Sequence, residues 1–334
     1  MALIQSRRGF LSTLAMLTAA RSFTPPAALA AHEALETTTI RLIKSPAPCT
    51  TPLYVAEDFL RAEGFSDIRY LPSLPGAQVS AFARGELDFG IIFVPEIVAG
   101  LDRGDAVTVL AGVHTGCFEL VGNEAIHTVG DLKGKSVGVQ GLGSPPHLFT
   151  SLIAAHIGID PVNDIRWVVS RSLRPVELFT AGKLDAFLSL PPDPMYLRAR
   201  HIGHVVVDSI VDRPWSEYFC CMLAGNRDFV QNYPVATKHV VRAILKALEL
   251  CATDPARAAQ QFLNRGFNSR YGYVLQTLSE LPYDKWREYD PEDTLRFYAL
   301  RMREVGFIKS VPQKIIADHT DWRFLEELKH ELKA

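Results

Sequence analysis

The sequence has little excess charge of either sign and, outside its first residues, no long apolar run. Lys and Arg number 35 against 37 Asp and Glu, which gives a net charge of −2. This balance provides no bulk positive charge to hold a polyanion, and no local basic patch stands out, so we expect no nucleic-acid partner. Beyond the N-terminus, no apolar stretch approaches the ~18–20 residues that span a bilayer.

Cysteine is scarce and is not arranged in pairs. The five cysteines form no C-x-x-C motif and show no metal-ligand spacing, so we expect no metal site and no cofactor. They are Cys49, Cys117, Cys220, Cys221 and Cys251. Cys220 and Cys221 are adjacent on a predicted strand, so their side chains should point to opposite faces. A Cys49–Cys117 disulfide remains open, although two packed thiols are favoured.

The composition is that of an ordinary globular chain. With 334 residues, of which 48% are apolar and 22% charged, the chain should form two packed units or one large α/β unit. These values exclude a disordered tail protein, a disulfide-knotted miniprotein and a coiled coil.

The first thirty residues are typical of an export signal. Residues 1–30 contain no Asp or Glu, and Arg7 and Arg8 precede an apolar run at 11–20. The segment ends on a small-x-small cleavage pattern at Ala30. Residues 6–11 (SRRGFL) resemble the bacterial twin-arginine signal, which predicts a periplasmic protein and the twin-arginine translocase as its export partner. A retained anchor and an amphipathic helix are the alternatives.

Strand and helix patterns alternate along the chain and then restart. Strands are predicted at 38–44, 68–71, 88–94, 107–113, 135–140, 165–169, 186–190 and 205–207. Helices are predicted at 52–62, 77–84, 145–157 and 174–181. This alternation favours mainly parallel sheets with helices on their faces.

A short motif occurs twice in the same setting. Phe82-x-x-Gly85-x-Leu87-Asp88 recurs 97 residues later as Phe179-x-x-Gly182-x-Leu184-Asp185. Each copy ends a predicted helix, supplies a glycine for the left-handed cap conformation and enters a strand. The repetition predicts two lobes of like topology.

The pattern changes after residue 215. A short strand at 219–224 is followed by helical patterns at 233–251, 255–264, 271–281, 291–304 and 322–333. The apolar stripes of this helical tail need a surface to cover, and the sheet of the first lobe is the expected one.

Several segments in this order resemble the substrate-binding proteins of ABC importers of the nitrate/taurine/alkanesulfonate and thiamine-pyrimidine-precursor kind. The resemblance runs from about Thr38 to Leu263. Its carriers are 52–56 (PLYVA), 83–88 (ARGELD), 131–139 (DLKGKSVGV), 141–147 (GLGSPPH) and 181–186 (AGKLDA). Yeast-type pyrimidine-synthesis relatives also resemble this family, but their cysteine-rich signature does not occur in the sequence.

The resemblance implies a two-lobed α/β fold of the periplasmic binding protein type (type II). Each lobe would have a mainly parallel sheet flanked by helices, with two crossover strands between lobes and a helical C-terminal tail. Lobe 1 would comprise 38–122 and 222–334, and lobe 2 would comprise 123–221. The implied function is capture of a small sulfonate, carboxylate or nitrogen heterocycle for an ABC permease and its ATPase, by a monomer without a cofactor.

In such sheets a ligand lies beyond the carboxyl ends of the strands, where helix N-termini offer free N–H groups. In lobe 1 these positions have hydroxyl, amide, aromatic and ionisable side chains, and ordinary capping or solvation is the alternative for each. The lobe 1 candidates are Cys49, Thr50, Thr51, Gly76, Gln78, Phe93, Glu96, His114 and Thr115.

In lobe 2 the glycine-rich turn at 141–144 lets backbone approach a ligand, and Arg171 and Arg174 can form a bidentate clamp on an anion or lie on a solvated rim. Pro192 and Asp193 stand where related proteins often carry an aromatic residue and a proline. The rings of Trp215 and Tyr218 can stack on a planar ligand or pack in the core. The lobe 2 candidates are Gly143, Ser144, His147, Arg171, Pro192, Asp193, Trp215 and Tyr218.

Motifs for catalysis are weak. There is no G-x-S-x-G elbow, and the glycine-rich turn lacks the Gly-Lys-Ser/Thr of a phosphate-binding loop. We therefore expect no enzyme activity. Two alternatives stay open: an enzyme on the same two-lobed fold that acts on a small heterocycle, and a ligand-binding receptor for a signalling partner.

Overall fold

The computed structural model describes residues 34–72, 77–170 and 173–332. The chain divides into two compact units, Met1–Ala34 and Leu35–Ala334. Only Ala34 of the first unit is described, so the export signal predicted for residues 1–30 lies outside the described residues. Every helix and strand of the described chain belongs to the second unit.

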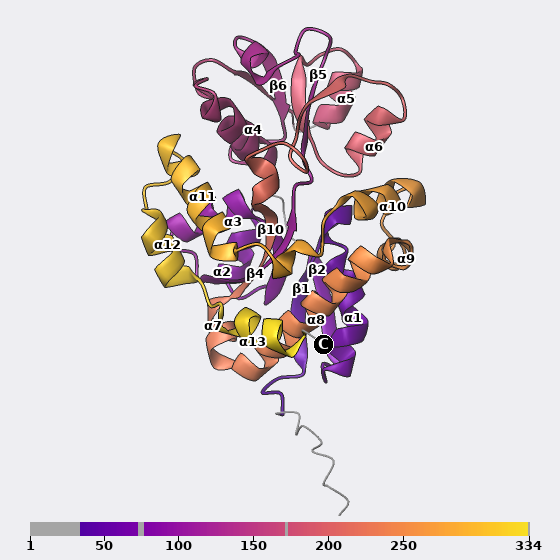
Figure 1. Cartoon of the computed structure of the whole chain (residues 1–334), viewed down its shortest axis with the longest axis vertical. Helices are drawn as coiled ribbons and strands as arrows, with labels where there is room; N and C mark the ends of the chain where they lie inside the picture. Colours follow the sequence, from indigo (N-terminus) through magenta and orange to yellow (C-terminus); the bar gives the residue numbers. More distant parts are fainter. Residues whose placement is uncertain (1–33, 73–76, 171–172, 333–334) are drawn as a thin grey trace, which may run out of the picture. The chain divides into compact units, whose positions relative to one another are not determined.

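Leu35–Ala334 is built on two five-stranded sheets (Figure 1). The first sheet has the strand order β2-β1-β3-β10-β4, and the second has the order β7-β6-β8-β5-β9. The first comprises β1 (Thr39–Lys44), β2 (Asp67–Pro72), β3 (Phe89–Phe93), β4 (Val107–Thr115) and β10 (Phe219–Asn226). The second comprises β5 (Glu119–Gly122), β6 (Ser136–Val139), β7 (Arg166–Val169), β8 (Ala186–Ser189) and β9 (His204–Asp208).

The two sheets share one topology. In each sheet the fourth strand, β10 or β5, runs antiparallel to both of its neighbours, whereas the first three strands are parallel. This arrangement confirms the predicted two-lobed α/β fold, with β10 and β5 in equivalent places.

The repeated sequence motif ends a helix and positions the following strand in both lobes. Gly85 and Gly182 both have φ +69°, the left-handed conformation that ends a helix, and no added Cβ would meet an atom within 4 Å. Asp88 then accepts a hydrogen bond from the backbone N of Arg41 in β1 (2.7 Å). Asp185 accepts the equivalent bond from the backbone N of Ser136 in β6 (2.8 Å). Asp88 therefore fixes the start of β3 to the neighbouring strand β1, and Asp185 fixes the start of β8 to β6 in the same way.

Helices follow the strands and begin near their carboxyl ends. They are α1 (Pro52–Ala62), α2 (Gln78–Ala83), α3 (Val94–Asp102), α4 (Pro145–His156), α5 (Pro175–Thr180) and α6 (Asp193–Arg198). Five of these six, α2 being the exception, have a proline in the first turn, where its missing N–H costs nothing. Helix N-termini consequently gather at the carboxyl edge of each sheet.

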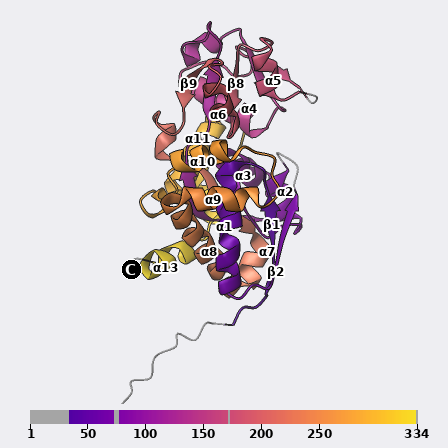
Figure 2. The same ribbon diagram turned by 90° about the vertical axis from the view of Figure 1, so that its right-hand side faces the viewer.

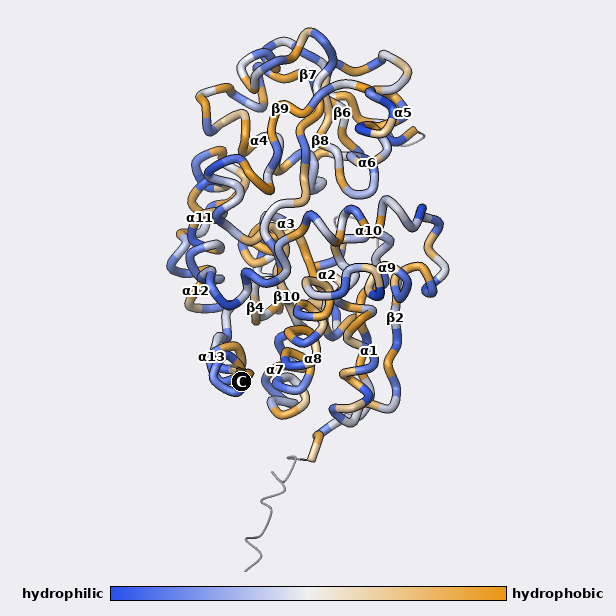
Figure 3. The backbone as a smooth tube through the Cα atoms, turned by 45° about the vertical axis from the view of Figure 1, so that its right-hand side comes forward, coloured by the Kyte–Doolittle hydropathy of each residue, from blue (hydrophilic) through white to orange (hydrophobic). Residues whose placement is uncertain are grey.

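The tail from residue 227 onward is helical and lies around the first sheet (Figures 1 and 2). Its helices are α7 (Arg227–Asn232), α8 (Pro234–Thr253), α9 (Pro255–Leu263), α10 (Tyr271–Glu280), α11 (Pro291–Glu304), α12 (Pro312–His319) and α13 (Arg323–Glu331). Polar and apolar residues are mixed along these helices (Figure 3). Such a mixture is the basis of the apolar stripes that were expected to cover the first sheet. No helix within the described ranges is long and apolar enough to cross a membrane.

Two connections join the sheets, as the resemblance implied. Residues 116–118 lead from β4 to β5, and residues 209–218 lead from β9 to β10. The Ser209 hydroxyl accepts hydrogen bonds from the backbone N of Cys117 (3.1 Å) and of Phe118 (2.9 Å). Gly116 has φ +52°, and a Cβ there would lie 2.6 Å from Cα of Ile210. The two connections are therefore packed directly against each other.

The strand pairing differs from the expected lobe boundaries in two places. Glu119–Gly122 forms β5 of the second sheet, and residues 219–221 pair in the first sheet. The sequence shows no clear strand at 119–122, because four residues between a loop and a turn give too short a pattern. The switch between sheets consequently falls within the two connections.

Candidate functional site

Two adjoining cavities lie among the loops at the carboxyl edge of the second sheet. The larger has a volume of about 590 Å³ and the smaller about 380 Å³. We call them together the cleft. The residues that line both are Arg174, Val176, Pro192, Asp193, Asn268 and Ser269.

The walls of the cleft come from segments far apart in the sequence. Pro46 and Ala47 follow β1, Gln140 follows β6, and Leu190 follows β8, and all four line the smaller cavity. The segment between α9 and α10, residues 267–270, supplies the facing wall. Strand ends from both sheets therefore reach the cleft, as expected for a ligand site in α/β proteins.

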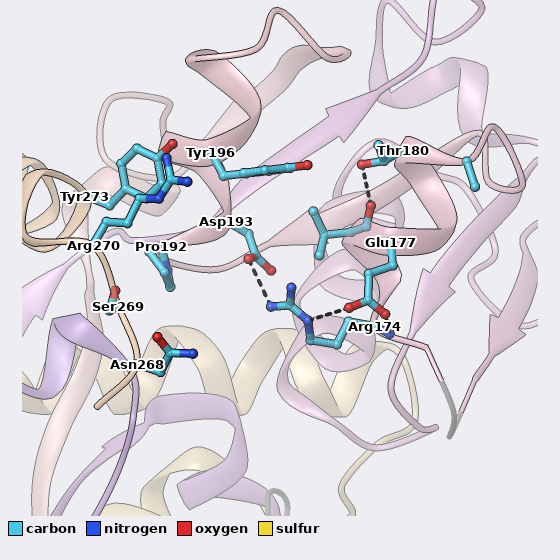
Figure 4. Close-up of a pocket in the computed structure, with 12 residues that line it drawn as sticks. Arg174, Glu177, Thr180, Pro192, Asp193, Tyr196, Asn268, Ser269, Arg270 and Tyr273 are labelled. Carbon is cyan, nitrogen blue, oxygen red and sulfur yellow. Dashed lines mark hydrogen bonds and ion pairs between the residues drawn. The ribbon is translucent and has the colours of Figure 1, made fainter. Parts of the chain in front are cut away.

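Arg174 is the central charged group of the cleft, and two carboxylates flank it (Figure 4). Its guanidinium lies 3.3 Å from Asp193 and 3.3 Å from Glu177. Burial raises the pKa of Asp193, and the Arg174 charge works against this rise. Hydrogen bonds from Arg174, first of all from its backbone N, lower the pKa of Glu177. The positive charge of Arg174 is thus largely balanced by its neighbours.

Two tyrosines add aromatic surface to the larger cavity (Figure 4). Tyr196 comes from α6, and Tyr273 comes from α10. The guanidinium of Arg200 lies 4.7 Å from the centroid of the Tyr196 ring, and that of Arg270 lies 5.6 Å from the Tyr273 ring. Each ring therefore has one face supported by a cation and can offer its other surface to a planar ligand.

Of the predicted contact residues, Pro192 and Asp193 line both cavities. Arg171 and Gly76 lie outside the described residues. Arg174, which the sequence offered as the second half of an anion clamp with Arg171, lies at the centre of the cleft.

Polar groups of the glycine-rich turn before α4 form hydrogen bonds within the turn and to the first turns of that helix. The backbone N of Gly143 donates to Nδ1 of His147 (3.1 Å), and the Ser144 hydroxyl donates to the carbonyl of Gly141 (2.7 Å). Burial lowers the pKa of His147, which keeps its ring neutral and able to accept this bond. The neighbours of the turn that line the cleft are Gln140 and Pro146.

In the first lobe the predicted hydroxyl donors also bond locally. Thr50 donates to the carbonyl of Ala47 (2.8 Å), and Thr51 donates to that of Pro48 (2.6 Å). Gln78 is the first residue of α2. Glu96 lies in the first turn of α3, and burial raises its pKa to about 7. Its Oε1 is buried without a hydrogen-bond partner among the described residues.

The predicted aromatic contacts pack with other rings. The Phe93 ring is 4.9 Å from that of Phe118. Trp215 is 3% exposed and lies 5.1 Å from Phe149, so it belongs to the core. Tyr218 stacks on a ring of the tail helix α11, with centroids 3.9 Å apart. None of Phe93, Trp215 and Tyr218 lines either cavity of the cleft.

The remaining candidates, Cys49, His114 and Thr115, are buried where the two connections enter the first sheet. Cys49 and His114 meet Cys117 there. The expectation that adjacent Cys220 and Cys221 point apart is wrong, because their sulfurs lie 3.9 Å from each other. The physical reason is a break in strand register on both sides of Cys221, which turns the side chain out of regular alternation. All five cysteines are described and free of disulfides.

Sequence reasoning missed the wall formed by residues 267–270 together with Tyr273. The segment follows Leu263, where the family resemblance ends, so it carried no functional expectation. A local signal exists: Asn264, Gly266, Asn268 and Ser269 form a loop-forming cluster directly before a helical pattern.

Comparison with known proteins supports the fold. The chain resembles the periplasmic nitrate-binding protein of Synechocystis PCC 6803, with 14% identity, a TM-score of 0.75 and 90% of each chain covered. It also resembles the alkanesulfonate-binding protein of Xanthomonas axonopodis pv. citri bound to MOPS, with 17% identity and a TM-score of 0.68. That match covers 86% of this chain and 100% of the other. These likenesses establish the fold.

Sequence comparison gives the family. Three 4-amino-5-hydroxymethyl-2-methylpyrimidine phosphate synthases of Saccharomyces cerevisiae are each 21% identical over 235 residues, covering 66% of this chain and 68% of each relative. A model of the NMT1-like family matches residues 35–263, which is more than half of the chain. The chain belongs to the NMT1-like family.

Proposed function

We propose that this chain is the periplasmic solute-binding component of an ABC importer. It captures one small polar organic molecule in the cleft and delivers it to a membrane permease that works with an ATPase. The observation that carries this proposal is the cleft, whose walls come from strand ends of both sheets and from the tail. The proposal takes the protein to act as a monomer that binds its ligand without transforming it.

The contacts between lobes support capture by closure. Arg198 of α6 forms ion pairs with Glu119 in its own lobe and with Glu280 of the tail helix α10, the latter at 2.8 Å. A ligand in the cleft touches the same two sides, so only a closed state collects all of its contacts. Binding energy then favours closure, and the permease can distinguish loaded from empty protein.

The charge balance of the cleft supports a neutral or zwitterionic ligand. Among the described residues, two arginines and two carboxylates line the larger cavity, namely Arg174, Arg270, Glu177 and Asp193. A free sulfonate would have to compete with Asp193 for Arg174, at the cost of leaving that half-buried carboxylate unpaired. A planar nitrogen heterocycle with donors and acceptors can instead bond both charges and contact Tyr196 or Tyr273.

Cys49 and His114 apart, the predicted contacts that do not line the cleft stay part of this proposal as predicted ligand contacts. Export by the twin-arginine route, and hence a periplasmic location, rests on the sequence of residues 1–30 and is likewise proposed.

A thermal-shift screen of residues 31–334 against sulfonates, carboxylates, ureides and pyrimidines tests the proposal. A true ligand at 100 times its dissociation constant should add about 2.7 kcal/mol to the free energy of unfolding. Stabilisation by a heterocycle without turnover supports a binding protein. Turnover of any of these compounds would favour the enzyme alternative and contradict the proposal.

Two cleft variants and a matched control locate the site. Arg174→Gln and Asp193→Asn should each weaken binding of the stabilising compound by at least about tenfold, because charge-assisted hydrogen bonds contribute about 1.5–3 kcal/mol. Arg69→Gln is the control, since Arg69 is also paired with an aspartate but lies on β2, outside the cleft lining. Equal affinities in all three variants would place the ligand elsewhere.

A further inference from the structure

Four of the five cysteines and one histidine form a buried cluster that the proposed binding function does not use. The sulfurs of Cys49 and Cys117 and a ring nitrogen of His114 all lie within 4.8 Å of one another. The sulfurs of Cys117, Cys220 and Cys221 do the same. Cys117 belongs to both groups, and every member is 6% exposed or less. We call these five residues the thiol cluster.

The spacing of the sulfurs suits a shared central ion. A tetrahedral ion with metal–sulfur bonds of about 2.3 Å holds its sulfur ligands about 3.8 Å apart. Of the ligands proposed below, Cys49, His114 and Cys117 lie within 4.8 Å of one another, and the Cys221 sulfur lies within 4.8 Å of the Cys117 sulfur. Cys221 further interacts with Cys49, Cys117 and His114. Small side-chain rotations therefore bring four ligands around one point.

His114 is already oriented as a metal-binding histidine. Its Nδ1 lies 2.9 Å from the carbonyl oxygen of Gly116, which can only accept, so Nδ1 carries a proton and donates. The other ring nitrogen, Nε2, is fully buried and has no hydrogen-bond partner among the described residues. Bonding of one ring nitrogen to a backbone carbonyl is the usual way in which proteins fix a metal-ligating imidazole.

An unpartnered nitrogen beside several sulfurs is costly in a dry interior unless something binds it. Thiolates and imidazole together select soft cations such as Zn²⁺ and Cu⁺ over Mg²⁺ or Ca²⁺, which prefer oxygen ligands. The absence of a carboxylate from the thiol cluster agrees with this selection.

We propose that Cys49, His114, Cys117 and Cys221 bind one thiophilic d10 cation in a closed structural site, with Zn²⁺ as the first choice and Cu⁺ as the second. Cys49 comes from the short 3-10 helix Pro48–Thr50 after β1, His114 from the end of β4, Cys117 from the first connection and Cys221 from β10. The ion therefore joins the first connection between the sheets to β4, β10 and the segment after β1 in the first lobe. Its role is to fix the base of the hinge, and it does not depend on the proposed transport function.

Metal retention by the purified chain is the test. Residues 31–334 are purified under reducing conditions, exposed to Zn²⁺ or to Cu⁺, separated from free metal by gel filtration and analysed by mass spectrometry of the metal. We expect roughly one ion per chain for at least one of the two metals. Cys117→Ser should retain less than about a tenth of this amount, because it removes a ligand common to both groups.

Cys251→Ser is the matched control. Cys251 is a fully buried cysteine of α8 outside the thiol cluster, so its variant should keep the ion. If Cys117→Ser does not fold, Co²⁺ bound to the unmodified chain should show thiolate charge-transfer absorption and tetrahedral d–d bands. Retention of neither metal, a Co²⁺ spectrum without these bands, or a disulfide within the cluster after purification would each overturn the proposal.

Discussion

The two sheets have the same strand order but very different surroundings. In the first sheet the outer strand β4 is buried along its whole length, whereas its counterpart β9 in the second sheet is partly exposed. The tail helices α8, α12 and α13 contact β4, and nothing comparable covers β9 among the described residues. The repeated motif is therefore common to both lobes and goes with their shared strand order. The tail helices, which contact the first sheet, determine how deeply its outer strand is buried.

This difference gives the lobes different physical roles. The first sheet with its tail forms a large core that includes the connections. Part of the second sheet packs on α5 and α6 in a smaller separate core, around Phe179 and Phe187. A heavily packed lobe suits a rigid base, and a lightly covered lobe suits the part that moves on ligand binding.

The repeated aspartates allow the strongest comparison. Asp88 accepts hydrogen bonds from the backbone N and from the guanidinium of Arg41, whereas Asp185 accepts from the backbone and hydroxyl of Ser136. Asp88→Ala should cost about 4 kcal/mol because it leaves a guanidinium without its partner. Asp185→Ala should cost about 2 kcal/mol, since its partners are neutral. Urea unfolding of both variants measures the difference, and equal losses would show that the ion pair adds nothing.

Two valines on the equivalent outer strands test the effect of the tail. Val109 of β4 is 0% exposed and Val205 of β9 is 40% exposed. Val109→Ala should therefore lower the free energy of unfolding by about 3 kcal/mol, and Val205→Ala by less than about 1 kcal/mol. A chemical denaturation series provides both values. Similar losses would contradict the claim that the tail makes the first lobe the more tightly packed one.

The acidic residues in the first turns of α3 and α6, the helices that follow β3 and β8, should differ in how they make stability depend on pH. Burial raises the pKa of Glu96 in α3 to about 7. The folded state then binds a proton that the unfolded chain releases near its ordinary pKa, so this group makes stability fall as pH rises from about 4.5 to 7. Glu96→Gln should remove about 3 kcal/mol of this fall.

The control for that measurement is Glu124→Gln, because Glu124 is exposed. Thermal unfolding between pH 4.5 and 8 should show the difference between Glu96→Gln and the unmodified chain growing with pH. A constant difference would mean that Glu96 is ionised at all these pH values. Its counterpart Asp193 in α6 has a nearby arginine, so the same slope is not expected from that position.

The smallest effect should be the same in both lobes. Gly85 and Gly182 share φ +69° and have open space around the missing Cβ. Ala at either position should cost about 1 kcal/mol, because only the left-handed backbone conformation is penalised. Calorimetric melting of the two variants should give equal shifts, whereas a larger loss at one site would indicate a role beyond helix capping.

Much of the fold could be predicted because local patterns decide it. The alternation of strands and helices and the motif from Phe82 to Asp88 with its copy gave the two lobes before any contact was known. The short strand β5 escaped notice, since its four residues acquire strand character only by pairing with β8 and β9.

The site was less accessible to sequence reasoning. Pro192 and Asp193 follow a recognisable strand, so their place in the cleft could be expected. The wall at 267–270 and the thiol cluster arise from chain segments that only tertiary packing brings together. Cys117 and Cys220, for example, are 103 residues apart in sequence. Metal-ligand motifs are recognised by short spacings in the sequence, and no such rule covers a pair this far apart. The sequence analysis therefore expected no metal-ligand group.

The central claim is that the two lobes close on one small molecule. Small-angle X-ray scattering of residues 31–334, with and without the compound that stabilises it, tests this claim most directly. Closure predicts a smaller radius of gyration in the presence of that compound, and no such change for Asp193→Asn at the same concentration. Superimposable curves for the unmodified protein, at saturating ligand, would contradict the account.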